Sequence, residues 1–161
     1  MSLQLQVSVE AAADPATAWS ELTDWAGQSR WIPFTTVQIV SQHEQGLGVR
    51  AAALSGFQLG RVPVGLLDNF VVTGWTPPAG GGAGELEVLH LGPYFTGEGA
   101  FRVEGVAGRT KITATEVFSL PGGAPVEAVV GLALPVMRRG FLASLQGLKK
   151  IVERSAAGAP R

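Results

Sequence analysis

The chain has 161 residues, 46% of them hydrophobic and 16% charged, and a formal net charge of −1. This length predicts one domain with its own hydrophobic core, and the absence of cysteine excludes disulfides, thiolate nucleophiles and cysteine-based zinc sites. The near-neutral charge argues against nucleic-acid binding, and the lack of a membrane-spanning run or a signal sequence predicts a cytoplasmic protein.

The beginning of the chain predicts a strand followed by two short helices. Apolar and polar residues alternate over 3–9, as in a half-buried strand. Asp14 followed by Pro15 is typical of a helix start, with the aspartate as N-cap, so a short helix is predicted over 16–22. A second short helix is predicted around 25–29.

Six further strands are predicted, separated by turns rich in glycine and proline. They cover residues 34–42, 48–54, 64–75, 85–91, 94–104 and 109–120. Residues 57–63, between the second and third of these, are expected to be irregular or a bulged edge. Together with the first strand they predict a seven-stranded antiparallel sheet.

The last third of the chain predicts one long helix that runs to about residue 154. Apolar residues recur at three- and four-residue spacing over 126–151, which is one face of a helix. Pro135 removes one helical hydrogen bond and predicts a kink. We expect a single domain over 1–154 and a flexible tail over 155–161, and the fold class is α+β.

Alternation along the strands indicates which side chains face the long helix. Gly97, Gly99 and Ala114 are on that face, so the middle of the sheet offers little side-chain volume. His90 and Glu116 share the face, although polar groups are costly in a dry core. With a charged share below the usual quarter, this pattern favours an internal cavity, and a dimer interface is the other place where apolar surface is commonly hidden.

Three polar residues are candidate catalytic groups. An inward His90 is suited to act as a general base or as a donor to a ligand carbonyl, and the alternative is a hydrogen bond to backbone. Burial raises the pKa of an inward Glu116, and a neutral carboxylic acid assists enolisation; the alternative is an ion pair with Arg50 or Arg138. Tyr94 adds a phenolic donor.

Seven apolar residues are candidates for the wall of the cavity, because aromatic rings and methionine suit a ring-bearing ligand. They are Trp31, Phe34, Phe70, Trp75, Phe95, Phe101 and Met137. The alternative is that such residues fill a core, as we expect of Trp19 and Trp25. No cofactor motif is present and the two histidines are far apart, so no cofactor or metal is expected.

The order of the elements resembles the helix-grip fold of START lipid-transfer domains, birch-pollen-type allergens and bacterial polyketide cyclase/dehydrase proteins. The resemblance rests on 7–19, Trp31, Pro33, 68–78, His90, 97–101, Arg109, Thr110 and Glu116. It implies a curved sheet wrapped around the C-terminal helix and a deep hydrophobic cavity between them. The mouth is then expected beside the second short helix and the loops between strands.

These observations lead to three hypotheses. The first is a binding protein for a hydrophobic or aromatic small molecule, of the lipid, polyketide or isoprenoid type. The second is a cyclase, aromatase or dehydratase that acts on a poly-β-carbonyl chain, with Glu116 and His90 as acid and base and Tyr94 as a donor. The third is a homodimer whose interface covers the apolar surface.

Overall fold

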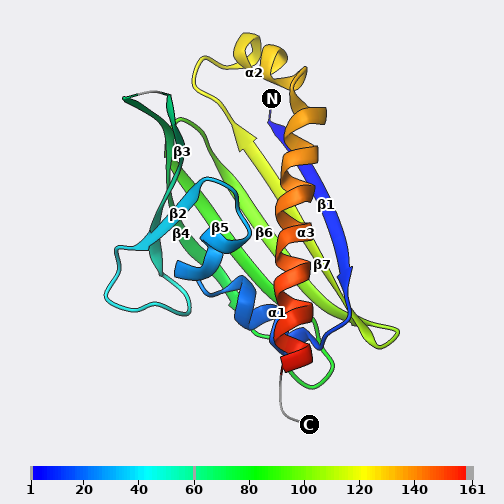
Figure 1. Cartoon of the computed structure of the whole chain (residues 1–161). Coiled ribbons are helices and arrows are strands. Elements are labelled where there is room, and N and C mark those ends of the chain that lie inside the picture. The colour runs from blue at the N-terminus through cyan, green and yellow to red at the C-terminus, as the bar shows by residue number, and fades with distance from the viewer. Residues whose placement is uncertain (1, 60, 159–161) are drawn as a thin grey trace.

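The computed structural model describes residues 2–59 and 61–158 and contains one sheet covered by helices on one face (Figure 1). The elements in chain order are β1 (Leu3–Ala11), α1 (Pro15–Leu22), the 3-10 helix η1 (Ala26–Arg30), β2 (Thr35–Ile39), β3 (Arg50–Leu59), β4 (Val62–Thr76), β5 (Gly84–Pro93), β6 (Thr96–Val106), β7 (Arg109–Ser119), α2 (Ala124–Gly131) and α3 (Leu134–Gly158). The predicted α+β class is confirmed.

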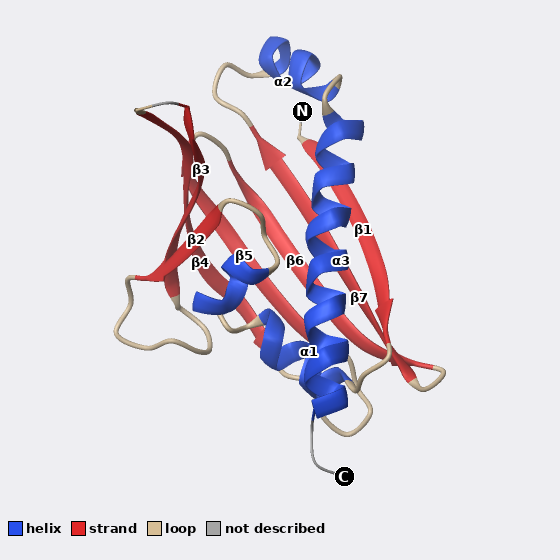
Figure 2. Ribbon diagram, viewed as in Figure 1, coloured by secondary structure: helices blue, strands red, loops and turns tan. Residues whose placement is uncertain are grey.

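All seven strands form one antiparallel sheet in the order β1-β7-β6-β5-β4-β3-β2. Strands β2 to β7 follow one another as neighbours, and β1 pairs with β7. Helix α3 packs back over β1, and Figure 2 shows it lying along the curved face of the sheet, with α1 near its C-terminal end. The fold is the helix-grip arrangement that the element order predicts.

Helix α1 begins where the sequence predicts. The side chain of Asp14 accepts hydrogen bonds from the backbone N–H of Thr17 at 2.9 Å and from its hydroxyl at 2.7 Å, and both lower the pKa of Asp14. Pro15 occupies the first helical turn, where its missing N–H costs nothing. The helix buries Ala18, Trp19 and Leu22 against the sheet.

The long C-terminal helix is divided in two rather than kinked. α2 and α3 are separated by two residues and meet at a bend of 65°. Pro135 lies at the second position of α3, where it has no N–H to donate to Gly131 and its ring would clash with the preceding helical turn. No single helix in the described ranges is long and apolar enough to cross a membrane, and α2 and α3 pass that test only as this bent pair.

Two boundaries differ from the predictions. β3 and β4 pair as far as Leu59 and Val62, so most of 57–63, predicted to be irregular, forms the end of a hairpin. α3 extends to Gly158, and the Ser155 hydroxyl donates to Glu21 of α1 at 2.6 Å. Of the predicted tail, 159–161 lie outside the described residues.

The interior is filled at one end of the molecule and hollow at the other. The larger core cluster joins α1, the end of η1, the C-terminal half of α3 and the middle of the sheet, and it includes Trp19, Trp25 and Trp31. A smaller cluster near the start of β1 contains Leu3, Leu5 and Phe118. The site described next lies beside this smaller cluster.

Candidate functional site

A cavity of about 460 Å³ lies between the sheet and the N-terminal half of α3. Most of its lining is apolar, and a few polar side chains are grouped among the rest. The lining residues are Leu5, Leu66, Asp68, His90, Tyr94, Phe95, Glu116, Phe118, Leu120, Val130, Met137, Gly140, Phe141 and Ser144.

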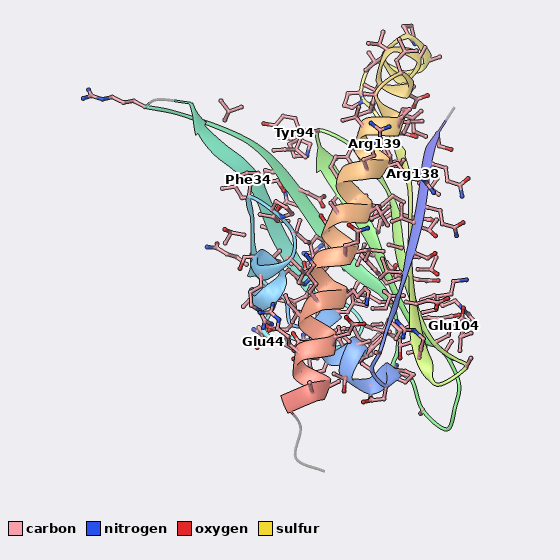
Figure 3. All side chains as sticks on the ribbon, turned by 45° about the vertical axis from the view of Figure 1, so that its right-hand side comes forward. Phe34, Glu44, Tyr94, Glu104, Arg138 and Arg139 are labelled. Carbon is pink, nitrogen blue, oxygen red and sulfur yellow. The ribbon has the colours of Figure 1, made fainter. Side chains whose placement is uncertain are left out.

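The mouth of the cavity is marked by lining residues that solvent reaches. Leu66 is 41% exposed, Tyr94 49% and Met137 37%, which places the mouth between β4, the β5–β6 turn and α3. Figure 3 shows Tyr94 at the same end of the molecule as Arg138 and Arg139. The resemblance implied a mouth beside the second short helix, but η1 packs against β2 and α1 instead and does not line the cavity.

Three polar side chains from three strands meet in the wall of the cavity. His90 lies between two carboxyl groups, with Nδ1 2.8 Å from Oδ2 of Asp68 and Nε2 3.1 Å from Oε2 of Glu116. The imidazole side chain is only 9% exposed, and both carboxyl side chains are largely buried. We call Asp68, His90 and Glu116 the polar cluster.

The register of the sheet explains how the polar cluster forms. His90 on β5 and Glu116 on β7 are separated by β6, and strands two apart in a sheet lie about 10 Å from each other. On β6 they face Gly97 and Gly99, which pair with His90 and Glu116 respectively. Because Gly99 has no side chain, the Glu116 carboxyl group has room to reach the imidazole above β6.

Gly99 is expected to be essential to this contact. A Cβ atom there would lie 2.8 Å from Oε1 of Glu116 and 2.9 Å from Cγ2 of Val88. Gly99→Ala should therefore push the Glu116 carboxyl away from His90, reduce the free energy of unfolding by about 1–3 kcal/mol, and lower the pKa of His90. Urea denaturation and an NMR titration of His90 measure the two effects.

Gly105→Ala on the same strand is the matched control. Its Cβ would meet only Cγ of Pro15, at 3.7 Å, so this variant should be as stable as the parent or slightly more stable. If Gly99→Ala and Gly105→Ala had the same free energy of unfolding and the same pKa of His90, the contact between His90 and Glu116 would not depend on Gly99.

The two carboxyl groups keep His90 protonated. Burial lowers the pKa of His90, but the hydrogen bonds to Asp68 and Glu116 and their negative charges outweigh it and raise that pKa from 6.5 to about 9. As an imidazolium at neutral pH, His90 donates through both nitrogens, so neither is free to accept a proton from a ligand. This geometry does not suit the predicted role of general base.

Glu116 is the member of the polar cluster suited to proton transfer. Burial raises the pKa of its carboxyl group, the hydrogen bond and charge of His90 lower it in part, and the charge of Asp68 raises it further. Its hydrogen-bond and ion-pair partner is His90, and not Arg50 or Arg138, the arginines named for the alternative of a structural hydrogen bond or ion pair. Within the described ranges, no three His, Asp or Glu side chains are arranged to hold a metal ion.

The structure gathers part of the predicted site. His90, Glu116 and Tyr94 all line the cavity, and so do Phe95 and Met137. The centroid of the Phe95 ring lies 5.0 Å from that of the His90 ring, with the two rings tilted by 47°.

The other predicted wall residues lie outside the cavity. Trp31 and Phe70 are buried in the larger core, and Trp75 and Phe101 pack against it, so the alternative of core filling describes all four. Phe34 is 76% exposed, with φ at +59°, and is not among the lining residues. Most of the aromatic residues that we expected in the cavity wall therefore belong to the larger core at the other end of the molecule.

Asp68 is the member of the polar cluster that sequence reasoning missed. Its position shares the parity of Phe70 and Val72, both buried, which is a signal for the inward face. The run of apolar residues over 70–72 hid that alternation. A register shift of β4 against β5 between Asp68 and Phe70 brings the carboxyl group to Nδ1 of His90.

Comparisons with known proteins place this geometry in context. The family model described as "Polyketide cyclase / dehydrase and lipid transport" matches residues 2–153. No curated protein sequence matches the chain.

Several solved structures have the same fold. TTHA0849 from Thermus thermophilus has a TM-score of 0.72 at 16% identity, over 98% of this chain and 100% of that one. The Zhui aromatase/cyclase from Streptomyces sp. R1128 has a TM-score of 0.68 at 18% identity, over 99% and 100%. The norcoclaurine synthase of Thalictrum flavum, a point mutant in complex with a transition state analogue, has a TM-score of 0.64 at 12% identity, over 96% of both chains. At these identities the likeness is one of fold.

Proposed function

The chain belongs to the polyketide cyclase / dehydrase and lipid transport family, and we propose that it binds a hydrophobic small molecule in the cavity between the sheet and α3. The family generally binds hydrophobic ligands. The observation that carries the proposal is a cavity of about 460 Å³ with an apolar lining and one group of polar side chains. This size and this composition are typical of small-molecule sites.

The lining differs between the two ends of the cavity, which supports a ligand with an apolar body and a polar end. The exposed mouth residues Tyr94 and Met137 lie at one end, and the largely buried polar cluster lies deeper. Between them, Phe95 and Phe118 form an edge-to-face pair with ring centroids 6.2 Å apart. Burying apolar ligand surface against these rings supplies the main free energy of binding.

Filling the cavity from α3 should abolish binding. Gly140 shares a helical face with Met137, Phe141 and Ser144, all of which line the cavity, and a Cβ added to it would meet no atom within 4 Å. Gly140→Phe should weaken binding of a neutral apolar dye such as Nile red by at least about tenfold, without loss of stability, because glycine is a poor helix former. A fluorescence titration measures the affinity.

Gly158→Phe is the control, because Gly158 also lies on α3 and also has open space around its Cβ, but is outside the cavity lining. This variant should bind the dye like the parent. Equal affinities for the two phenylalanine variants would mean that the dye binds elsewhere, and the proposed site would be wrong.

A second candidate function is acid–base catalysis on a carbonyl compound, as in a cyclase, aromatase or dehydratase. It is favoured by the raised pKa of Glu116, which brings this carboxyl group nearer to the working pH of a proton-transfer residue. As a carboxylate it would take a proton from the carbon next to one ligand carbonyl. That carbon would then form a bond to a second carbonyl carbon of the same chain, and Glu116 would return the proton to the alkoxide oxygen that results, giving the alcohol. A turnover assay with a poly-β-carbonyl substrate separates this function from binding alone. The homodimer and the cytoplasmic location stay predictions.

A further inference from the structure

The polar end of the cavity indicates what kind of ligand it takes, and we propose that it receives a hydrogen-bond donor, the hydroxyl or ammonium group of an otherwise apolar molecule, and disfavours carboxylates. This inference rests on the proposed function, because it concerns the same cavity. It adds the chemical class of the ligand's polar group and the direction in which the ligand lies.

The polar cluster has no hydrogen-bond donor left for a ligand. Both ring nitrogens of His90 are engaged, one with Asp68 and one with Glu116. The hydroxyl of Ser144, the next polar lining group, donates to the carbonyl oxygen of Gly140 at 3.2 Å. A ligand that reaches this end with an acceptor, such as an ester carbonyl or a carboxylate, therefore finds no partner among these groups.

Acceptors, by contrast, are left over. Oδ1 of Asp68 has no hydrogen-bond partner among the described residues, but it is fully buried, so it contributes its charge rather than a direct contact to a ligand in the cavity. Glu116 forms its hydrogen bond through Oε2, and no described residue donates one to its Oε1. A carboxylate oxygen only accepts, and a buried one without a donor is unfavourable. A ligand hydroxyl or ammonium group that donates a hydrogen bond to Oε1 of Glu116 removes this unfavourable free energy.

Charge points to the same class of ligand. When Asp68 and Glu116 are both ionised, their two carboxylates and the imidazolium of His90 leave the polar cluster with a net charge of −1. Among the residues that the structure describes, no lysine or arginine lines the cavity; Arg138 and Arg139 follow Met137 on α3 but are not lining residues. An ammonium group is attracted to this end, a hydroxyl group is accepted, and a carboxylate is repelled with no cation nearby to compensate.

A competition experiment with one chain length and different polar groups tests the inference. The four competitors are decylamine, 1-decanol, decyl methyl ether and decanoate. Each is titrated against Nile red bound to the protein at about pH 8, where decanoate is ionised, and the loss of dye fluorescence gives its affinity. We expect decylamine and 1-decanol to bind at least about tenfold more tightly than decanoate and decyl methyl ether. A preference for the amine over the alcohol shows that charge selects the ligand, and equal binding of the two shows that hydrogen bonding is enough.

Variants of the carboxyl groups sharpen the test. Asp68→Asn replaces a carboxylate, which only accepts hydrogen bonds, with an amide that also donates them, and it removes one negative charge. The difference in affinity between decanoate and the two donor ligands, decylamine and 1-decanol, should therefore become smaller or reverse. Glu116→Gln provides the same change on the other strand, in case one variant does not fold. Binding of Nile red itself reports that the cavity is intact in each variant.

The outcomes separate the inference from the proposed function. Decanoate or the ether binding as tightly as 1-decanol would overturn the inference while leaving a hydrophobic binding site in place. An unchanged preference in both amide variants would also overturn it. If neither the dye nor any competitor binds, the proposed function itself fails.

Discussion

The protein should lose about 3 kcal/mol of unfolding free energy as the pH rises from about 6.5 to about 9.5. The pKa of His90 is 6.5 in the unfolded chain and about 9 in the folded protein, and each pKa unit corresponds to about 1.4 kcal/mol. Because the folded state binds this proton more tightly, the stabilisation is fully present below the unfolded pKa and is lost as pH rises through the folded one.

The other shifted groups act outside this window or in the same direction. The pKa of Glu116 is also raised, so its contribution too declines as pH rises, beginning in the ordinary range of a glutamate. The lowered pKa values of Asp14 and Glu153 stabilise the fold above the ordinary carboxyl range and lose this effect only in acid. The alkaline loss is therefore assigned to His90.

Urea denaturation followed by tryptophan fluorescence measures this profile, since Trp19, Trp25 and Trp31 are buried in the larger core. His43 provides the control: its side chain is exposed and, among the described residues, bonds only to the carbonyl oxygen of Leu47, so His43→Gln should keep the alkaline loss. A parent protein whose unfolding free energy is constant over this pH range would contradict a protonated His90 in the fold.

Removal of the imidazolium should be the most destabilising single change in the cavity. His90→Ala leaves the carboxyl groups of Asp68 and Glu116 buried on the same wall with no cation between them. Loss of one partner from a buried ionic group typically costs about 3–5 kcal/mol, and we expect an effect of this size near neutral pH. Chemical denaturation of the variant and of His43→Ala, which should be close to the parent, measures it.

A second substitution distinguishes charge from packing. Adding Glu116→Gln to His90→Ala removes one of the two unpaired carboxylates, so the double variant should be more stable than the sum of the single effects predicts. Additive effects would indicate that His90 contributes only its packing against Phe95 and Phe70, whose rings lie 5.0 and 6.3 Å from its own.

The strands of the sheet were predictable, because apolar and polar residues alternate clearly along a strand when helices cover one face of its sheet. Over β5, β6 and β7 the inward positions follow the predicted parity, and Val88, Ala114 and Phe118 are buried as expected. The same parity placed His90 and Glu116 on the inner face. Their direct contact was not predictable from parity, because it depends on the pairing of β6 with both neighbours and on Gly97 and Gly99 facing these two residues.

The position of the cavity was harder to predict than its existence. Aromatic residues serve equally as core and as pocket wall, and the choice between them depends on which elements cover each end of the sheet. Trp31 follows η1 and is buried where α3 approaches closely: a Cβ on Gly147 would lie 3.1 Å from the Trp31 carbonyl oxygen. That close approach fills one end of the molecule, and the cavity lies at the other end, beside the N-terminal half of α3.

The break between α2 and α3 also has a sequence basis that was only partly recognised. Pro135 predicted a local distortion, and its position near the start of α3 is one that proline tolerates well. The apolar periodicity continues across the break and suggested one helix. α2 turns away from α3 by 65°, and its Val130 lines the cavity together with Met137 of α3.

We propose that an apolar molecule lies in this cavity with its donor group on the Glu116 carboxyl group, beside Asp68. A crystal structure of the protein with decylamine tests this most directly. We expect the alkyl chain between Phe95, Phe118 and α3, and the ammonium nitrogen within hydrogen-bonding distance of Oε1 of Glu116. An ammonium group at the mouth beside Tyr94, or a cavity closed by side chains with no bound molecule, would contradict it.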